Sequence, residues 1–367
     1  MQMKIEPATR QFESWLGRQI PLVRADLVLK HTFMTRDPFS FLRATCYRWM
    51  QVWPQVCADI VRAPVVLAVG DLHLENFGTW RDREGRLIWG VNDFDEAYPL
   101  PYTNDLVRLA VSAALAIKAQ HLTIRPQAAC DAILTGYMDA LKAGGQPFVL
   151  AEHHGWLREI ATNILRDPVR FWEKMQALPP LKGTISARAR AALDHLMPEP
   201  RLSYRLRRRV SGMGSLGHPR YVALAEWQGG TIAREAKALA ASACLWAREG
   251  QGPHTIQYQA LLDRAVRSRD PWVHVQDNWI VRRLAPYCSH IELASLPKKR
   301  DESRLLYAMG CETANIHLGS RNAITAVQRD LSKRKTHWLR LATTAMVNAT
   351  ISDWAEWGHS TRRTART

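Results

Sequence analysis

Three polar residues in two short segments carry the clearest chemical signal in the sequence. Asp71 and Asn76 lie five positions apart in the segment 70–76 (GDLHLEN), and Asp93 follows in the segment 92–96 (NDFDE). Phosphoryl transfer uses such a set: one Asp orients the attacking hydroxyl, while an Asn and a second Asp hold the Mg²⁺ that bridges the phosphates. Oxygen ligands suit Mg²⁺. Because both segments occur in this order, they favour phosphoryl transfer over a pair of ordinary Asp-containing turns.

Each of these segments directly follows an apolar run that predicts a buried strand. The first run is 65–69 (VVLAV), and the second is 86–91 (RLIWGV), which follows a turn at 82–85. Two strand ends of this kind can present their carboxylates to one pocket. The segment 93–96 also places several negative charges close together, which is unfavourable unless a cation or a basic side chain compensates them.

A glycine-rich segment much later in the chain has the features of a phosphate-binding loop. Residues 212–217 (GMGSLG) fit the pattern G-x-G-x-x-G, and a β-hairpin is predicted after them, over 221–237. Glycines allow backbone N–H groups to approach phosphates closely. A dinucleotide-binding motif would need a helix after the glycines, so the following strand favours a kinase-type loop. The nucleotide-binding residues expected here are Gly212, Gly214, Ser215 and Gly217.

A kinase also needs a cation on the third strand of its sheet to meet the α- and β-phosphates. Arg234 lies at the usual interval after the glycine loop, whereas Lys237 has the more usual chemistry. The two side chains point to opposite faces of a strand, so only one of them can face the nucleotide. The sequence leaves open which one does, and also whether both are solvated. It does not identify the helical Glu that pairs with such a lysine, because the segment 255–266 contains no Glu.

Segment 70–76 resembles the catalytic loop of aminoglycoside phosphotransferases and related small-molecule kinases, whose pattern is H-G-D-x-H-x-x-N, with Val69 in place of the first histidine. Segment 92–95 resembles their metal-binding I-D-F/W-D segment, and 102–109 (YTNDLVRL) resembles the helix start whose Asp supports the catalytic loop. The resemblance implies these roles: Asp71 as catalytic base with His73 in the same catalytic loop, Asn76, Asp93 and Asp95 as metal ligands, and Asp105 as structural support.

The order of these elements differs from that of an ordinary kinase, in which the β-rich lobe precedes the catalytic loop. Here a predicted helical segment precedes Asp71, and the β-rich segment follows; residues 308–317 (AMGCETANIH) resemble the helix that normally leads into the catalytic loop. This order resembles a bacterial family of unknown function, the domain-of-unknown-function family 2252. The matching segments are 39–44, 70–78, 92–96, 212–217 and 234–236, with Arg234 where that family has Lys.

We therefore predict an α+β protein with a two-lobed, protein-kinase-like fold that is circularly permuted, with a mostly helical large lobe and a small antiparallel β-sheet lobe. The predicted divisions are an N-terminal helical segment (1–64), the catalytic-loop and metal-binding part of the helical lobe (65–204), a β-rich nucleotide-binding lobe (205–292) and C-terminal helices that complete the helical lobe (293–367). Arg43 is expected either to approach the carboxylates of 93–96 or a phosphate, or to form a surface salt bridge.

The formal net charge of +16 favours anionic partners. Basic runs such as 205–209 (RLRRR) are expected to be solvated surface. Six scattered cysteines without a CxxC pair predict free thiols. No apolar run approaches the roughly 18–20 residues that a membrane span needs, and the first residues lack the apolar core of a signal peptide. We therefore expect a cytoplasmic protein without a membrane partner.

The predicted function is Mg²⁺- and ATP-dependent phosphotransfer to an unknown small-molecule acceptor, with AMP transfer on the same scaffold as a variant. One alternative is a catalytically inactive kinase fold that binds nucleotide or, through its net charge alone, nucleic acid. Another is a metal-dependent phosphoesterase, because segment 71–73 (DLH) has the D-x-H opening of two-metal sites. The remaining candidate ligands for that site are His153, His154 and His317.

Overall fold

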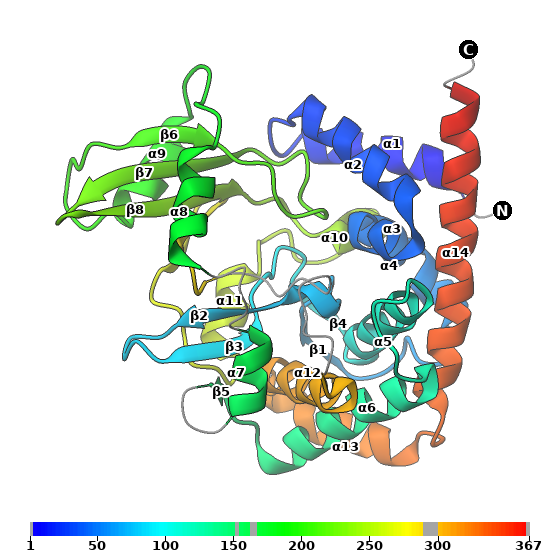
Figure 1. Ribbon diagram of the computed structural model, residues 1–367. Helices are drawn as coiled ribbons and strands as arrows, with labels where there is room; N and C mark the ends of the chain where they lie inside the picture. Colours follow the sequence, from blue (N-terminus) through cyan, green and yellow to red (C-terminus); the bar gives the residue numbers. More distant parts are fainter. Residues whose placement is uncertain (1–2, 151–153, 162–166, 289–299, 365–367) are drawn as a thin grey trace.

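The computed structural model describes residues 3–150, 154–161, 167–288 and 300–364. These residues form 14 α-helices and three antiparallel sheets, so the predicted α+β class is confirmed (Figure 1). The six cysteines are free thiols, as predicted. Among the described helices, none is both long enough and apolar enough to cross a bilayer.

The segment before the first strand is helical, as predicted. It forms α1 (Ile5–Gly17), α2 (Arg24–Arg36), α3 (Pro38–Ala44) and α4 (Cys46–Val56). The start of α3 is fixed by its sequence, because the Asp37 side chain accepts a hydrogen bond from the Ser40 N–H and Pro38 takes the first helical position. Aromatic packing joins the helices: the rings of Phe12 and Tyr47 stack with centroids 4.4 Å apart.

Two small sheets carry the loops that hold the predicted catalytic and metal-binding segments. The strands are β1 (Val65–Ala68) paired with β4 (Tyr98–Pro101), and β2 (Phe77–Arg81), β3 (Leu87–Val91) and β5 (Phe148–Val149) in one three-stranded sheet, with a short 3₁₀ helix η1 (Leu74–Asn76) between β1 and β2. The strands predicted at 65–69 and 86–91 are present as β1 and β3. β4 was not predicted, because two of its four residues are prolines, which weaken a strand pattern.

A layer of three helices supports these sheets. The helices are α5 (Thr103–Lys118), α6 (Pro126–Ala143) and α12 (Glu302–His317), and α13 (Ile324–Lys333) follows α12. α6 and α12 cross at very short range: a Cβ on Gly136 would collide with the Tyr307 carbonyl, and one on Gly310 would collide with the Ile133 carbonyl. Reciprocal glycines therefore set the position of α12, whose last residue is His317.

The third sheet has five antiparallel strands in the order β6-β7-β8-β10-β9. The strands are β6 (Arg205–Arg208), β7 (Arg220–Trp227), β8 (Gly230–Ala238), β9 (Val273–Gln276) and β10 (Trp279–Leu284). The predicted hairpin is β7–β8, and its turn residues Gln228 and Gly229 have positive φ. Between β8 and β9 lie the short helices α10 (Ala243–Ala247) and α11 (Tyr258–Arg264).

The remaining helices flank this sheet or run along the helical body. They are α7 (Gly155–Ala161), α8 (Pro168–Gln176), α9 (Ala187–His195) and α14 (Trp338–Thr364). α9 packs on β8 and β10, while the long α14 crosses the N-terminal helices and α5 on the far side from the sheet (Figure 1). Segments from both halves of the chain therefore build the helical body.

Candidate functional site

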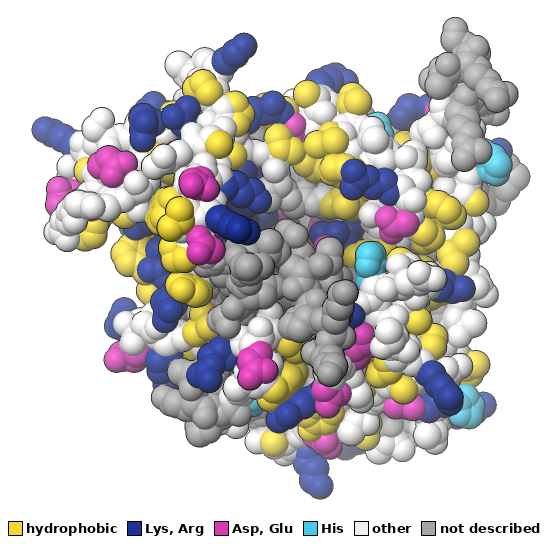
Figure 2. All heavy atoms as spheres, in the orientation of Figure 1, with side chains coloured by type: hydrophobic (Ala, Val, Ile, Leu, Met, Phe, Trp, Pro, Cys, Tyr) yellow, Lys and Arg dark blue, Asp and Glu magenta, His cyan; other side chains and the backbone are white. Residues whose placement is uncertain are grey.

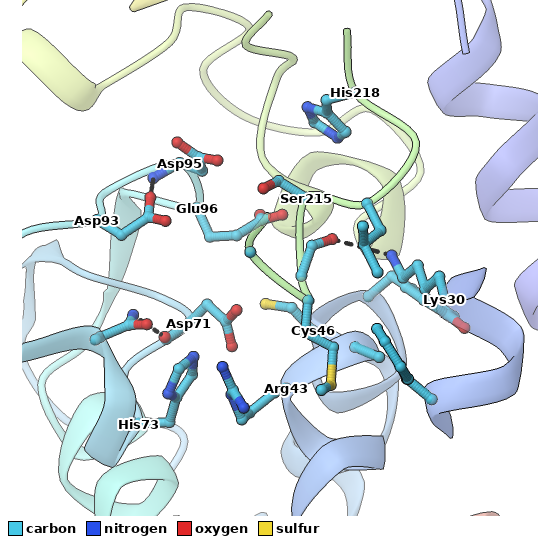
Figure 3. Close-up of a pocket in the computed structure, with 18 of the residues that line it drawn as sticks. Lys30, Arg43, Cys46, Asp71, His73, Asp93, Asp95, Glu96, Ser215 and His218 are labelled. Carbon is cyan, nitrogen blue, oxygen red and sulfur yellow. Dashed lines mark hydrogen bonds between the residues drawn. The ribbon is translucent and has the colours of Figure 1, made fainter. Parts of the chain in front are cut away.

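A cavity of about 600 Å³ lies where three separate parts of the chain meet, within the size range of small-molecule sites. Its walls come from the loops after β1 and β3, from the glycine-rich segment before β7, and from the N-terminal helices. Figure 3 shows acidic side chains from the first two loops facing Ser215 and Lys30 across the cavity. The predicted site residues that line it are Arg43, Asp71, His73, Asn76, Asp93, Asp95, Gly212, Gly214 and Ser215. The predicted residues Asp105, Gly217, Arg234 and Lys237 do not line it.

Asp71 is anchored by a fully buried arginine of α5. Arg108 Nε donates to Asp71 Oδ1 at 2.8 Å, its Nη2 also contacts that oxygen, and its Nη2 donates to the Leu42 carbonyl at 2.9 Å. Asp71 Oδ2 faces the glycine-rich segment, since a Cβ on Gly214 would lie 3.4 Å from it. Burial raises the pKa of Asp71, and Arg108 opposes that rise. The carboxylate is therefore fixed by one oxygen and directs the other into the cavity.

Asp105, in the first turn of α5, bonds the backbone just before Asp71. Asp105 Oδ2 accepts from the Val69 N–H at 2.7 Å, and Oδ1 accepts from the Gly70 N–H at 3.0 Å. His317 Nε2, at the end of α12, lies 3.1 Å from Asp105 Oδ2. Both side chains are completely buried. The sequence did not single out this His317–Asp105 contact, because the two residues lie 212 positions apart.

Gly70 has a conformation that only glycine adopts without strain. Its φ is +81°, and a Cβ there would collide with the Glu96 carbonyl oxygen. The loop after β1 and the loop after β3 therefore touch at this residue. This contact brings the segment that carries Asp71 beside the one that carries Asp93 and Asp95.

Asn76 and Glu75 complete the loop after β1. Asn76 Nδ2 donates to the Asp71 carbonyl at 2.5 Å, which leaves its Oδ1 as a candidate ligand. The Asn92 N–H donates to the Asn76 carbonyl at 3.0 Å, which ties the two loops together. His73 Nδ1 accepts from the Glu75 N–H at 3.2 Å. Arg43 pairs with Glu75 at 2.5 Å, so it contacts the loop after β1 rather than the carboxylates of 93–96.

Lys237, on β8, bridges two carboxylates of the loop after β3. Its Nζ lies 2.6 Å from Asp95 Oδ2 and 3.4 Å from Asp93 Oδ1. Burial and the neighbouring Asp93 raise the pKa of Asp95 to about 7, against the effect of Lys237. Asp95 Oδ1 is buried and has no hydrogen-bond partner among the described residues. An orphaned carboxylate oxygen beside a second carboxylate fits a hard cation such as Mg²⁺.

Described side chains form no cluster of three or more His, Cys, Asp or Glu residues arranged around a metal. Oxygens of Asn76, Asp93 and Asp95 nevertheless face one cavity. Of the histidines considered for a phosphoesterase, His154 lies against Phe148 with the two rings tilted, and His317 contacts Tyr137 and Asp105. His153 lies outside the described residues. The structure therefore does not bring His154 or His317 to the cavity.

Arg234 faces the opposite side of β8 from Lys237, as strand alternation requires. Its Nε donates to the Leu196 carbonyl at 2.9 Å, and its guanidinium lies 4.8 Å from the ring centre of Trp272. Burial lowers the pKa of Arg234 to about 10. Of the two cations that the sequence left open, Lys237 is the one at the Asp93–Asp95 carboxylates. In the described residues, the acidic groups bonded to Lys237 come from this loop rather than from a helix.

The glycine-rich segment is tied to the sheet through a buried carboxylate, Glu235. Three guanidinium groups contact it: Arg209, Arg220 at 2.7 Å and Arg282 at 2.8 Å. These cations hold the pKa of Glu235 well below its usual value, although burial opposes them. Arg220 Nη2 also donates to Ser215 Oγ at 2.9 Å. The expectation of a solvated basic run is therefore wrong for Arg209, because its guanidinium pairs with the buried carboxylate of Glu235.

Two further residues of the cavity were missed at the sequence level. Lys30 Nζ donates to the Gly214 carbonyl at 3.0 Å, and burial lowers the pKa of this lysine. Glu96 Oε2 accepts from Ser242 Oγ at 2.8 Å and from the Ala243 N–H at 2.7 Å. Burial raises the pKa of Glu96 to about 7. No spacing pattern marks Lys30, because its partner is a backbone carbonyl 184 positions away.

Positive charge is not confined to the cavity. On the face shown in Figure 2, Lys and Arg side chains are spread among acidic and apolar ones rather than gathered in one patch. The net charge alone therefore does not mark a nucleic-acid surface on that face.

Residues 22–170 match the model of a family described as "Uncharacterized protein conserved in bacteria (DUF2252)". This range includes the loops that carry Asp71, Asn76, Asp93 and Asp95, and it ends before the glycine-rich segment. No curated protein and no solved structure matches the chain. Over residues 22–170, the chain is therefore similar to the bacterial DUF2252 family.

Proposed function

We propose that the protein is a Mg²⁺- and ATP-dependent phosphotransferase with a circularly permuted, protein-kinase-like fold, acting on a small-molecule acceptor. One observation carries the proposal. Asp71 and Asp93 share a cavity with the glycine-rich segment 210–216, which lies more than a hundred residues later in the chain. Lys237 contacts the carboxylate of Asp93 from the sheet that holds this segment. These are the parts that phosphoryl transfer requires.

The arrangement around the five-stranded sheet supports a kinase-like fold. The glycine-rich segment joins the first two strands of the sheet, and Lys237 lies on the third. Protein kinases place their glycine-rich loop and their phosphate-binding lysine on the corresponding strands. The glycine conformations suit this role, since Gly212 and Gly217 both have positive φ.

The contact between α12 and β1 supports the permuted order. The Leu67 N–H, in β1, donates to Ser320 Oγ at 2.8 Å, just beyond the end of α12. A chain that left α12 could therefore enter β1 directly, as in a kinase of the usual order. Here β1 precedes α12 by more than two hundred residues. Such a rearrangement keeps the spatial neighbours and changes only the connections.

Under this proposal, each residue of the site has a separate role in phosphoryl transfer. Asp71 Oδ2 would accept the hydroxyl proton of the acceptor, while Arg108 holds Oδ1 and fixes the orientation. Asn76, Asp93 and Asp95 would hold Mg²⁺, which supplies neutralising charge for the phosphates when bound. Lys237 would exchange one carboxylate contact for a phosphate oxygen. The backbone N–H groups of the glycine-rich segment would cover the phosphates from above.

The experiment that tests this proposal measures ATP binding by calorimetry with and without Mg²⁺, followed by ATP consumption. Asp71→Asn should abolish consumption and keep Mg²⁺-dependent binding, whereas Asp59→Asn, an exposed control, should change neither. The products distinguish the variants of the proposal, because ADP indicates phosphoryl transfer and pyrophosphate indicates AMP transfer. A wild-type protein that neither binds nor consumes ATP would refute the proposal.

A second candidate function is nucleotide binding without catalysis. The observation that favours it is the Arg108–Asp71 ion pair, which neutralises the proposed base inside the protein. Under this alternative, Mg²⁺-dependent ATP binding occurs, no ATP is consumed with any acceptor, and Asp71→Asn behaves like the wild type.

A further inference from the structure

A second cavity, of about 350 Å³, lies behind the loop that carries Asp93 and Asp95. Successive residues of this loop alternate between the two cavities: Asn92 and Phe94 line the second, whereas Asp93 and Asp95 line the first. The Tyr258 hydroxyl, from α11, donates to the Asn92 carbonyl at 3.4 Å, and its ring packs edge-on against Phe94. The loop is therefore the wall that the two cavities share.

The second cavity has an excess of positive charge. Its lining includes five arginines: Arg83, Arg267, Arg269, Arg282 and Arg283. Against these stand two lining carboxylates, Asp263 and Asp270, and Arg269 already pairs with Asp263 at 3.1 Å. Even when Glu235, the partner of Arg282, and Glu312, which interacts electrostatically with Arg267, are added to the acidic side, the five arginines still outnumber the four carboxylates. A polyanion is the ligand that this imbalance suits.

Arg267 is held in place without an ion pair to its guanidinium among the described residues. The group lies 4.5 Å from the ring centre of Trp80 and 5.0 Å from that of Phe94. Its Nε and Nη1 are buried and have no hydrogen-bond partner in the described part of the chain. Unpaired buried donors are costly, and each one calls for an explanation. The rings of Trp80 and Phe94 thus hold the charged Arg267 guanidinium at the wall of a cavity that has a net positive charge.

We propose that this second cavity binds a small phosphorylated ligand, with Arg267 and Arg282 as its main contacts. A phosphate dianion matches the charge excess and accepts several hydrogen bonds from guanidinium groups. The cavity volume leaves room for a small organic group next to Trp80 and Tyr258. This site is separate from the proposed catalytic cavity, and its existence does not depend on the proposed function.

Ligand binding in the second cavity would affect the first cavity by two routes. The direct route is the shared loop, because movement of Phe94 displaces its neighbours Asp93 and Asp95. The other route runs from Arg282 to Glu235, then to Arg220, and from there to Ser215 of the glycine-rich segment. A bound phosphate that draws Arg282 away from Glu235 would weaken this series of contacts. The ligand therefore regulates the metal-binding loop and the glycine-rich segment together.

Phenyl phosphate is a suitable probe, and isothermal titration calorimetry with the full chain measures its binding. We expect one saturable site, weakened about tenfold or more by Arg267→Met, because a hydrogen bond to a charged group contributes about 1.5–3 kcal/mol. Arg83→Met, at an exposed lining residue, should also weaken binding while preserving the fold. Arg125→Met removes an exposed charge that does not line the cavity, and it should bind like the wild type.

Three results would overturn the proposal. The first is no binding to the wild type. The second is unchanged affinity in both Arg83→Met and a folded Arg267→Met, with folding checked by near-UV circular dichroism. The third is equal binding of phenol, which lacks the phosphate. Failure of ATP turnover alone would leave this site intact, so the two proposals are tested separately.

Discussion

Lys237 Nζ lies 2.6 Å from Asp95 Oδ2, and this ion pair joins β8 to the loop after β3 across 142 positions of sequence. The pair links the sheet that follows the glycine-rich segment to the loop of Asp93 and Asp95, although Lys237 itself does not line the cavity. Lys237 is almost fully buried, and Asp95 keeps one oxygen without a partner among the described residues. Under the proposed function, Lys237 is the cation that a phosphate would recruit, and Asp95 is a carboxylate that a metal ion would take over.

Replacing Lys237 by Met should weaken both the fold and nucleotide binding. The variant leaves Asp93 and Asp95 without their cation, and we expect a loss of about 2 kcal/mol in the free energy of unfolding, less than for fully buried pairs because both carboxylates are partly exposed. Arg234→Met is the matched control on the opposite face of β8. ATP affinity should fall at least tenfold in the first variant and stay unchanged in the second. The reverse result would assign the phosphate contact to Arg234.

Replacing Glu96 by Gln should flatten the pH dependence of stability. Burial raises the pKa of Glu96 to about 7, so the folded protein binds this proton more tightly than the unfolded chain does. The stability contribution of Glu96 is therefore greatest at low pH and is lost as the pH rises from about 4.5 to about 7. Gln keeps an oxygen for the Ser242 and Ala243 donors, both of which bond Oε2 in the wild type.

We expect Glu96→Gln to be more stable than the wild type by about 1–2 kcal/mol at pH 8 and by less at pH 5, after allowance for partial exposure. Urea unfolding at both values measures the difference. Parallel stability curves for the two proteins between pH 5 and pH 8 would contradict the assigned pKa direction.

Replacing Asp105 by Asn should release the loop that holds Asp71. An amide has one acceptor oxygen, so it cannot serve the N–H groups of Val69 and Gly70 while also facing His317. A cost of about 2–3 kcal/mol follows from the buried donors left unpaired. Hydrogen exchange at the Val69 and Gly70 amides should accelerate by about a hundredfold or more. Unchanged exchange at both amides would show that Asp105 does not hold the loop.

Replacing Gly70 by Ala should be far more harmful than the same change at Gly85. Both glycines have positive φ, but only a Cβ at Gly70 meets the Glu96 carbonyl, while the space around Gly85 is open. Gly85→Ala should therefore cost only about 1 kcal/mol of backbone strain. Gly70→Ala should exceed that cost by about 2 kcal/mol or more, because it also pushes two loops apart. Thermal unfolding of both variants separates the effect of the contact with Glu96 from that of backbone strain. Equal losses of stability in the two variants would contradict the close approach of Gly70 to the Glu96 carbonyl.

Local patterns in the sequence were sufficient for much of the fold. The helix start predicted within 102–109 is the beginning of α5, and the hairpin predicted over 221–237 is β7–β8. Here the hydrophobic period and the turn residues agree with the tertiary structure. β4 was missed because Pro99 and Pro101 weaken the strand pattern, although each meets a residue of β1 in the antiparallel pairing.

The site was predictable only as far as its residues belong to short segments. Asp71, Asn76 and Asp93 follow strands that periodicity identifies. The partners of these residues come from distant elements, and no spacing in the sequence relates Arg108 to Asp71 or Glu235 to three arginines. The sequence could not decide between Arg234 and Lys237 for the same reason. Strand alternation places the two side chains on opposite faces of β8, but only the packing of the sheet determines which face lies toward the carboxylates of Asp93 and Asp95.

The contact between Asp105 and His317 has a consequence for biosynthesis. A ribosome releases the loop that bears Asp71 more than two hundred residues before it releases the imidazole that completes its anchor. Domains generally assemble as units during translation, so the pocket of this nascent chain stays incomplete until α12 has emerged. Cells that make the protein would thus have to protect this incomplete pocket from aggregation and proteolysis. Premature termination before α12 would yield a product in which Asp105 lacks its contact with His317.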